Sequence, residues 1–509
     1  MSSHSSDVWL KPLEQILPIA NSNARFCALL DVVEGDPSDR GHVVDLVARV
    51  NAGLSAGHDP RLAADGTGGA YMLSDDKGVV CAIFKPCDEE IYCANNPRGL
   101  SSGFTSPNSS QHSSHSDAVD PGRRSRSTTM PSMSELLQMA AHSAPLSFGS
   151  AHSGSVGVPT QRIRKGIAPG SAACREHAVF LLDHEHRAGV PLTMLAVVAH
   201  EAFFVADEHG ARSRKTLVTK IGSLQEFAPH DYVAEDLPMR TIKRFSVDNV
   251  HEIAVLDLRT FNTDRNGGNL LVRDRSARTP SSTQTPSLVT TPSVDSDGEL
   301  EAVALSLSVD SDVTTARERR LMRRTPTASP AKAVDADATP PLLVPVDHGL
   351  CLPEDLQESW FEWLTWPQSR VPFSDEMKER IARLSWRNDW DKLRRFGTFS
   401  RAVRRVLRTS YLVLQLGAAH DLTPFAIASI ACREQLAEMS ALEKAAAKAC
   451  ELSGGECDEF VVDNDDDDDE DDYFAVLETQ LRELMQNSGS GRQASSDHQH
   501  THGFQFDDL

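Results

Sequence analysis

The 509-residue sequence lacks long apolar runs and paired cysteines. A membrane-spanning helix needs about 20 consecutive apolar residues, and no stretch approaches that length. The first residues, MSSHSSDVWLKPLEQ, have neither the basic start nor the apolar core of a secretion signal. The nine cysteines include no C-x-x-C pair. We therefore expect a cytoplasmic protein with reduced thiols, and neither a disulfide framework nor a zinc site.

Basic residues are the minority among the charged ones. The chain has 51 Lys and Arg against 73 Asp and Glu, a formal net charge of −22. A nucleic-acid partner requires a basic face for its phosphates, so we expect none. Much of the negative charge is the run DNDDDDDEDD at 463–472, which repels itself and is typical of a solvated tail. We interpret residues 451–509 as an acidic disordered tail.

Two internal stretches are poor in the apolar residues that a folded core needs. Residues from about 100 to 160 are dominated by Ser, His, Gly and Pro, and residues from about 275 to 340 by Ser, Thr, Pro and Asp. Both compositions predict disordered inserts, which together with the tail are where protein partners would bind. The remaining chain divides into a segment of unknown role at 1–60, with a strand near 26–33 and a helix near 42–50, and a folded domain at 61–450.

The folded domain begins with a glycine-rich turn. The stretch DGTGGAYML, from residue 65, places Gly66, Gly68 and Gly69 before a strand, and DDKG turns the chain into a second strand, VVCAIFKPCDEE. Backbone amides of such a turn can approach a phosphate, and Lys85, late in the second strand, can reach the same phosphates. Glycine-rich hairpins and solvated lysines are common, so the pair alone indicates a nucleotide site only weakly.

The sequence SAACREHAVFLLDHE, from residue 171, has its apolar residues at helical spacing. Glu176 on this helix could pair with Lys85 and orient it. The alternative is an ordinary exposed glutamate, and the sequence leaves both readings open.

A third motif is TFNTDRNGGNLLV, Thr260–Val272. Its Asp264 and Asn269 have the D-x-x-x-x-N spacing of a phosphoryl-transfer loop, in which the Asp meets the attacking hydroxyl and the Asn holds a metal ion. The alternative is a polar turn between two strands. When the second predicted insert is left out, the motif is followed by LLVPVDHG, which could pair with it as a hairpin and place Asp347 beside the loop. An Asp there, two residues before a Gly, is typical of a metal ligand in kinases.

Five segments together resemble a known family: AIFKPCDEEIYCANNPRGL, GSLQEFAPHDY, LDLRTFNTDRNGGNLLV, VPVDHGLCLPE and FEWLTWPQSRVPFS. They are similar to the phosphatidylinositol 3-/4-kinase catalytic domain family, most of all to its plant-type phosphatidylinositol 4-kinase gamma (type II-like) group. The resemblance covers roughly Asp65–Cys450 without the inserts. It implies an α+β, atypical two-lobed protein-kinase-like fold, with an antiparallel sheet and one helix in the N-lobe, a hinge, and a mainly helical C-lobe.

The resemblance also implies roles for individual residues. Lys85 would bind phosphate with Glu176 as its helix partner, Asp264 would be the catalytic aspartate, and Asn269 and Asp347 would hold Mg²⁺ or Mn²⁺. ATP would be bound by Gly66, Gly68, Gly69, Lys85 and the hinge residues Gln225, Glu226 and Phe227. The implied activity is ATP-dependent phosphorylation of phosphatidylinositol at its 4-hydroxyl group. The alternatives are Ser/Thr protein kinase activity on the same fold and a catalytically silent scaffold.

Membrane contact is expected to be peripheral and reversible, because the cysteine cluster palmitoylated in animal type II enzymes is absent and stable anchoring takes two signals. We place the lipid substrate tentatively at Arg370, Trp363 and Trp366, since indoles favour a bilayer interface. Packing inside the C-lobe is the alternative for these tryptophans. It is also the alternative for the basic amphipathic segment Lys392–Arg408, which could otherwise attract anionic lipid.

Overall fold

The computed structural model describes residues 25–30, 37–100, 164, 166–206, 216–274, 339–394, 399–453 and 470–490. The two predicted inserts and most of the predicted tail lie outside these residues. All helices and strands named below belong to one compact unit, which excludes residues 274–341.

The N-lobe is built on a six-stranded sheet in which every neighbouring pair is antiparallel. Its order is β1-β5-β6-β4-β3-β2. The strands are β1 Phe26–Leu29, β2 Arg61–Leu62, β3 Tyr71–Ser74, β4 Val80–Pro86, β5 Thr193–His200 and β6 Val218–Glu226. The sequence of β5, TMLAVVAH, is buried along its whole length, as a strand with both faces covered should be.

Two helices cover the opposite faces of this sheet. Helix α2, Pro37–Ser55, packs on the face that carries Met194, Ala196 and Val198 of β5. The start of α4, Ala172–Leu182, packs on the face that carries Leu195 and Val197. Because successive side chains of a strand point to opposite faces, β5 contributes to the hydrophobic cluster on each side of the sheet. Since β1 and α2 belong to this lobe, the predicted boundary at residue 61 is wrong, although the predicted strand and helix in residues 1–60 are present.

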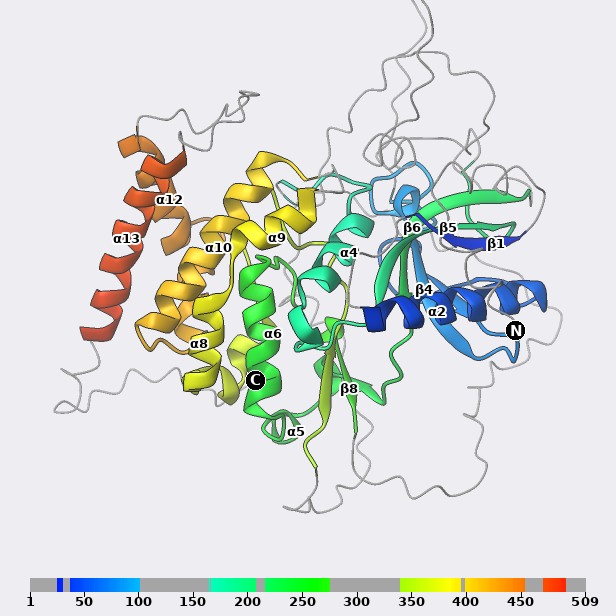
Figure 1. Cartoon of the computed structure of the whole chain (residues 1–509), viewed down its shortest axis with the longest axis horizontal. Coiled ribbons are helices and arrows are strands. Elements are labelled where there is room, and N and C mark those ends of the chain that lie inside the picture. The colour runs from blue at the N-terminus through cyan, green and yellow to red at the C-terminus, as the bar shows by residue number, and fades with distance from the viewer. Residues whose placement is uncertain are drawn as a thin grey trace, which may run out of the picture. The chain divides into compact units, whose positions relative to one another are not determined.

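The C-lobe is mainly helical, and Figure 1 shows its helices gathered on one side of α4 and the N-lobe sheet on the other. It also holds a three-stranded antiparallel sheet, in the order β7-β8-β9. Ser or Thr side chains accept a hydrogen bond from the third helical residue at the starts of α6, α8, α9, α10 and α11, as N-caps do. The elements are β7 Tyr232–Val233, α5 Met239–Ile242, α6 Val247–Arg259, β8 Leu270–Arg273, β9 Leu342–Pro345, α8 Asp375–Arg383, α9 Trp386–Leu393, α10 Arg401–Ala419, α11 Pro424–Ala431, α12 Ala441–Ser453 and α13 Asp471–Ser490.

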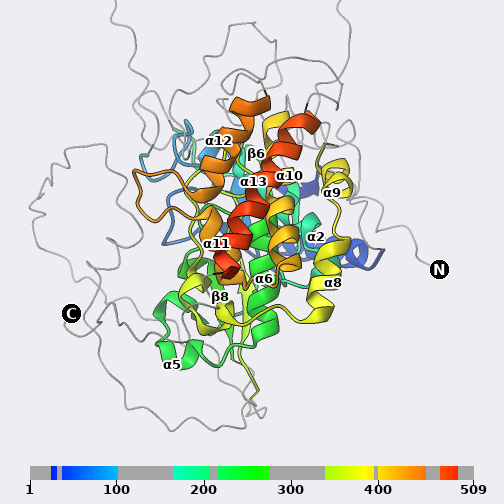
Figure 2. The ribbon, with the colours of Figure 1, turned by 90° about the vertical axis from the view of Figure 1, so that its left-hand side faces the viewer.

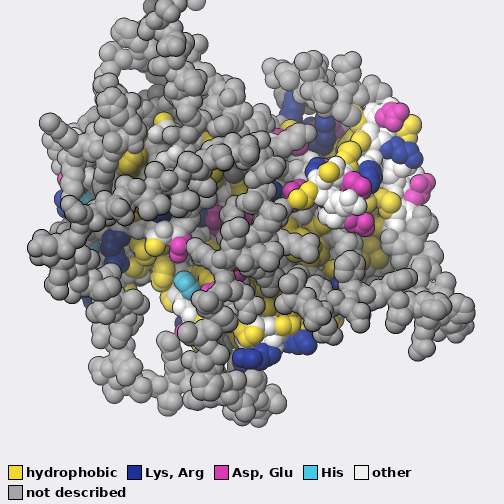
Figure 3. Space-filling model, turned by 180° about the vertical axis from the view of Figure 1, so that it is seen from behind, with side chains coloured by type: hydrophobic (Ala, Val, Ile, Leu, Met, Phe, Trp, Pro, Cys, Tyr) yellow, Lys and Arg dark blue, Asp and Glu magenta, His cyan; other side chains and the backbone are white. Residues whose placement is uncertain are grey.

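The last helix corrects the predicted extent of the tail and decides between the two interpretations of the basic segment. Residues 471–490 form α13, which buries Phe474, Leu477, Leu481 and Met485 against α12 and α10, so this part of the predicted tail is folded (Figure 2). Arg408 of α10 lies 2.9 Å from Asp471 and stacks over Phe474. The basic face of α10 thus packs within the C-lobe, and Figure 3 shows basic and acidic side chains interspersed on the side that carries α12 and α13.

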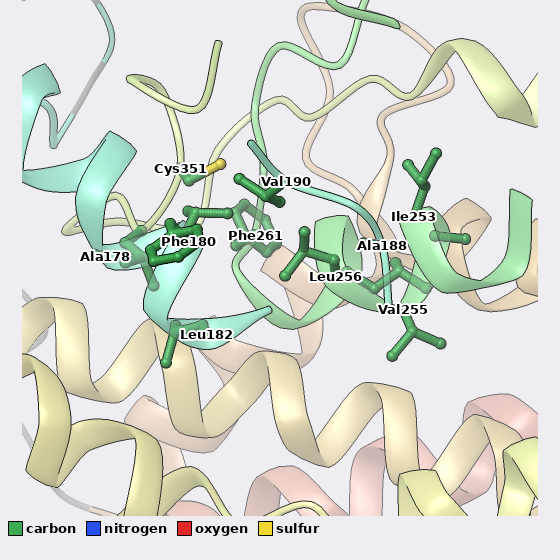
Figure 4. Packing of buried hydrophobic residues seen from close by; sticks show 14 of the residues in the cluster. Ala178, Phe180, Leu182, Ala188, Val190, Ile253, Val255, Leu256, Phe261 and Cys351 are labelled. Atoms are coloured by element: carbon green, nitrogen blue, oxygen red, sulfur yellow. The ribbon is translucent and has the colours of Figure 1, made fainter. Parts of the chain in front are cut away.

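The two lobes share one hydrophobic core. Phe180 and Leu182 of α4 belong to the same buried cluster as Leu256 of α6 and Phe261 (Figure 4). The arrangement confirms the predicted α+β, two-lobed fold. Among the helices that the structure describes, none combines the length and the apolarity of a bilayer span. Seven described cysteines are free thiols, as expected, whereas Cys450 is disulfide-bonded, which was not expected.

Candidate active site

Lys85, Glu176 and Asp347 meet where the lobes face each other. The Nζ of Lys85, on β4, lies 2.5 Å from Oε1 of Glu176, on α4, and 3.2 Å from Oδ1 of Asp347, just after β9. The Glu176 side chain is 2% exposed, whereas that of Asp347 is 56% exposed. The backbone amide of His348 donates to the other oxygen of Glu176 at 3.0 Å. Helix α4 therefore holds both the lysine and the segment that carries Asp347.

The charges of this group stabilise one another. Burial is the largest influence on the pKa of Lys85 and lowers it, but Asp347 and Glu176 together outweigh it and hold that pKa above its ordinary value. Burial likewise raises the pKa of Glu176, but Lys85 and contacts from His348 outweigh it and hold that pKa well below its usual range. The lysine is thus kept charged and the glutamate ionised at neutral pH.

Asp347 itself has a left-handed backbone conformation, with a φ of 57°. A non-glycine residue there is strained and is found mainly at functional sites. Arg175 of α4 donates to the carbonyl groups of Cys351 and Leu352. Gly349 lies so close to α4 that a Cβ atom would come 2.8 Å from Cβ of Ala172. These contacts hold the segment that follows Asp347 against α4.

The loop that carries Asp264 is held in place by the buried carboxylate of Asp257. Asp257, on α6, is fully buried, and the Nε–H of Arg265 donates to both of its carboxylate oxygens, at 3.1 Å to each. It also accepts from the Asn262 side chain at 2.9 Å and from the Trp363 indole at 3.0 Å. Because a buried charge needs such partners, these four residues form one rigid base for the loop.

The same arginine ties the loop to the hairpin of β8 and β9. Its Nη1 donates to the carbonyl oxygens of Asn269 and Val346 at 2.9 and 2.8 Å, and the Val346 amide donates to Asn269 at 3.0 Å. The Asn269 side-chain amide donates to the Asp264 carbonyl at 3.0 Å. The β8–β9 pairing that we predicted therefore brings Asn269 and Asp347 to the same place as Asp264.

Asp264 has an environment suited to taking up a proton. Burial raises the pKa of its carboxyl group above the ordinary value, and the charge of Asp347 adds to this effect, while Arg164 opposes it. The Asn266 amide lies 3.4 Å from Oδ2, and Nη2 of Arg164 lies 3.6 Å from Oδ1.

The glycine-rich turn lies at the Lys85 end of the sheet, because Tyr71, directly after the turn, pairs with Phe84. The turn is anchored to a buried acidic cluster. Gly69 donates to the Glu89 carbonyl at 2.9 Å, and a Cβ atom at Gly69 would overlap the Glu89 side chain. The Glu89 carboxylate accepts from Tyr71 at 2.7 Å and lies 3.3 Å from Lys220.

The predicted hinge residues lie at the end of β6, but three of their hydrogen-bond donor groups already have partners within the protein. The Gln225 side chain is buried and donates to Thr193 at 2.9 Å. The amides of Glu226 and Phe227 donate to the carbonyl groups of Leu192 and Cys81. Adenine binding by the Gln225 side chain, or by these two amides, is therefore excluded in this structure.

The predicted lipid contacts are corrected in part. Trp363 and Trp366 are 0% and 1% exposed, so the alternative of C-lobe packing holds for both and they cannot lie at a bilayer interface. Arg370 is exposed and stacks over the ring of Phe425, 3.8 Å from its centroid. No contact links it to the Asp264 loop among the described residues.

Sequence reasoning missed the residues that support the site. Asp257 and Arg265 belong to the predicted motif region, and the charge of Asp257 inside the apolar run IAVLDL was a signal that it is paired. Arg164 had no such signal, because it follows the first predicted insert and meets Asp264 only in three dimensions.

The sequence model of the family described as "Phosphatidylinositol 3- and 4-kinase" matches residues 156–427, more than half of the chain. The chain belongs to the phosphatidylinositol 3- and 4-kinase family. It is 31% identical over 388 residues to phosphatidylinositol 4-kinase gamma 5 of Arabidopsis thaliana, a match of 76% of this chain and 44% of that protein. It is 29% identical over 423 residues to phosphatidylinositol 4-kinase gamma 4 of the same plant, covering 80% and 52%. The chain thus spans about half the length of these relatives.

A kinase of this family implies ATP as substrate and a divalent metal ion, and the residues present fit the metal. Asn269 and Asp347 offer oxygen ligands beside each other. One amide and one carboxylate are a donor set that a hard divalent ion such as Mg²⁺ accepts in kinases, where water and substrate phosphates complete its shell.

Proposed function

We propose that this chain transfers the γ-phosphoryl group of ATP to the 4-hydroxyl group of phosphatidylinositol. The observation that carries the proposal is the convergence of Lys85, Glu176, Asp264, Asn269 and Asp347, from four separate stretches of a chain that belongs to this kinase family. The relatives carry the name phosphatidylinositol 4-kinase, which supports the lipid and the 4-position.

Each residue contributes by position and charge. Asp264 orients the acceptor hydroxyl and accepts its proton, for which a raised pKa is an advantage because the acid formed is weaker. Lys85, kept charged by Glu176, neutralises the phosphate oxygens of ATP. Asn269 and Asp347 would hold Mg²⁺, which would supply positive charge against the charge that develops on the transferred group. Fixed charges of this kind provide most of the catalysis in phosphoryl transfer.

The glycine turn and the end of β6 frame the nucleotide. Gly66 and its neighbours lie at the phosphate end, next to Lys85, whereas Glu226 and Phe227 lie at the other end of β4, where Glu226 pairs with Ala82. ATP would therefore lie along β4, with its adenine near the carbonyl groups at the end of β6.

The experiment offers the purified protein γ-labelled ATP and Mg²⁺ with phosphatidylinositol vesicles and, in parallel, casein. The variants are Asp264→Ala and, as a matched control, Asp391→Ala, which removes an aspartate that is 55% exposed on α9. We expect labelled lipid that co-migrates with phosphatidylinositol 4-phosphate, a loss of at least ~10²-fold in kcat for Asp264→Ala, and no change for Asp391→Ala.

Other results would redirect the proposal. Label at another hydroxyl would overturn the 4-position and leave a lipid kinase. Label only in casein, lost in Asp264→Ala, would make the chain a protein kinase with the same site. ATP binding without transfer to either acceptor would indicate a silent scaffold.

A further inference from the structure

Arg164 lies beside the proposed catalytic aspartate and has no role in the proposal so far. Its Nη2 is 3.6 Å from Oδ1 of Asp264, and its Nη1 is 3.9 Å from Oε2 of Glu358. Both distances exceed the roughly 2.9 Å typical of an N–H···O hydrogen bond. The three side chains are partly exposed, 26% for Arg164 and 36% for each carboxylate. The guanidinium is therefore accessible and is held tightly by neither carboxylate.

The position of Arg164 is fixed by a tight turn. The Ile167 amide donates to the Arg164 carbonyl at 3.1 Å, and Gly166 between them has a φ of 76°. A Cβ atom at Gly166 would come 2.8 Å from the amide nitrogens of Glu354 and Asp355, and the Glu354 amide donates to Gly166 at 3.0 Å. Only glycine fits this close approach. The turn is thus docked on the segment that leads to Glu358.

Arg164 and Lys85 serve different parts of the site. Lys85 pairs with Glu176 and Asp347, on the side where the ATP phosphates are proposed to lie. Arg164 pairs with Asp264 and Glu358 instead. Its charge therefore faces the acceptor at Asp264. The phosphodiester of phosphatidylinositol lies across the inositol ring from the 4-hydroxyl, so the end of the guanidinium that would meet it is Nη1, beside Glu358, and not Nη2, beside Asp264.

We propose that Arg164 binds the phosphodiester of the acceptor headgroup, so that the site selects a hydroxyl carried by a ring that also bears a phosphate. This inference rests on the proposed function, because it takes phosphatidylinositol as the acceptor. A guanidinium presents parallel N–H donors that match two phosphate oxygens. Glu358 occupies the guanidinium in the absence of the acceptor, and the phosphodiester replaces it.

The experiment compares Arg164→Gln, Arg164→Lys and Glu358→Gln with the control Arg383→Gln, which removes an arginine that is 69% exposed on α8. Phosphorylation of phosphatidylinositol vesicles gives KM and kcat for the lipid. Hydrolysis of ATP without acceptor reports the state of Asp264 and of the nucleotide site. Soluble inositol 1-phosphate and inositol serve as competitors, which separates headgroup recognition from attraction to a charged vesicle surface.

We expect Arg164→Gln to raise KM for the lipid roughly 10- to 100-fold, the size of a lost hydrogen bond to a charged group. The fall in kcat/KM for the lipid should exceed any fall in the rate of ATP hydrolysis at least tenfold. Arg164→Lys should restore part of the lipid affinity, because lysine keeps the positive charge but lacks the parallel N–H donors of a guanidinium. Glu358→Gln should lower KM, since the competing carboxylate is gone. Inositol 1-phosphate should inhibit the wild type better than inositol does, and Arg164→Gln should remove that difference.

Three results would overturn the inference. The first is an equal loss of lipid phosphorylation and ATP hydrolysis in Arg164→Gln, which would show that Arg164 acts through Asp264 or on ATP. The second is a rise in KM for Glu358→Gln, which would make the Arg164–Glu358 pair structural. The third is a wild type that labels casein and no lipid, which overturns the proposed function as well and is recognised before any variant is tested.

Discussion

Glu176 offers the sharpest test of the arrangement around Lys85. The substitution Glu176→Gln keeps the size of the side chain and an oxygen that can accept from the His348 amide, but it removes the charge 2.5 Å from Lys85. Breaking a fully buried ion pair costs about 3–5 kcal/mol. Lys85 is 27% exposed and keeps Asp347 at 3.2 Å. We therefore expect Glu176→Gln to lower the free energy of unfolding by about half of that, roughly 2 kcal/mol.

A second effect acts in the same direction. Without Glu176, Lys85 has Asp347 as its remaining anionic partner, and a lysine paired there competes with a metal ion for that carboxylate. The pair with Glu176 also holds Lys85 where the ATP phosphates are proposed to lie. Loss of roughly 2 kcal/mol of this positioning energy would lower kcat/KM for ATP by up to roughly 30-fold, since 1.4 kcal/mol corresponds to a factor of about ten. The Mg²⁺ concentration for half-maximal rate should rise as well.

The assay measures lipid phosphorylation across ATP and Mg²⁺ concentrations, with thermal unfolding of each variant to confirm that it is folded. The control is Glu185→Gln. Glu185 follows α4, its side chain is 70% exposed, and it pairs with Arg187 at the surface. A Glu176→Gln enzyme within threefold of the wild type, at every Mg²⁺ concentration, would refute the reasoning.

Three further predictions concern the support of the site. Gly69→Ala should raise KM for ATP and lower Tm, because its Cβ atom would overlap Glu89. Gly41→Ala, with open space around it inside α2, should leave KM unchanged and leave Tm the same or slightly higher, because alanine favours a helix over glycine; equal effects of the two substitutions would contradict this. Burial raises the pKa of Glu89 from 4.5 to about 7, so the folded protein binds more protons than the unfolded one between these values, and the free energy of unfolding should fall as pH rises through them, by up to roughly 3 kcal/mol. Denaturant unfolding at several pH values should show a shallower fall in Glu89→Gln, and an unaltered slope would exclude Glu89 as its source. Asp257→Ala should lower the free energy of unfolding by about 3–5 kcal/mol, because it leaves the Arg265 charge buried and unpaired; denaturant unfolding would contradict this with a loss below 1 kcal/mol.

Much of the fold could be predicted because its patterns are local. The strands β4 and β6 and the helix α4 each follow from apolar spacing and turn residues within a short stretch. The β8–β9 hairpin was predictable because the composition of the segment between its strands marked that segment as an insert. The same holds for Lys85, Asp264, Asn269 and Asp347, whose places in such stretches allowed the convergence to be inferred.

The rest depends on packing between distant segments, which one sequence does not display. Trp363 has the amphipathic character of a bilayer-interface residue, but its indole donates to a buried aspartate instead. CDEE, at the end of the second predicted strand, gives no sign of a buried acidic cluster, yet Glu89 is buried and lies 3.3 Å from Lys220 of β6. Helix α13 was not predicted because it directly follows the acidic run. Its apolar face packs against α10 and α12, and this contact is not visible in the sequence.

The register of the β8–β9 hairpin makes the protein tolerant of changes in the length of the segment that joins β8 to β9. Arg273 and Leu342 are paired neighbours across the two strands, so the chain leaves the catalytic domain and re-enters it at a single spot on the strand ends that point away from Asn269 and Asp347. Loop closure costs only about 0.6 kcal/mol for each doubling of length. Evolution could lengthen or shorten the intervening segment freely, and an engineer could replace it with a reporter domain, while the spacing of the two metal ligands stayed the same.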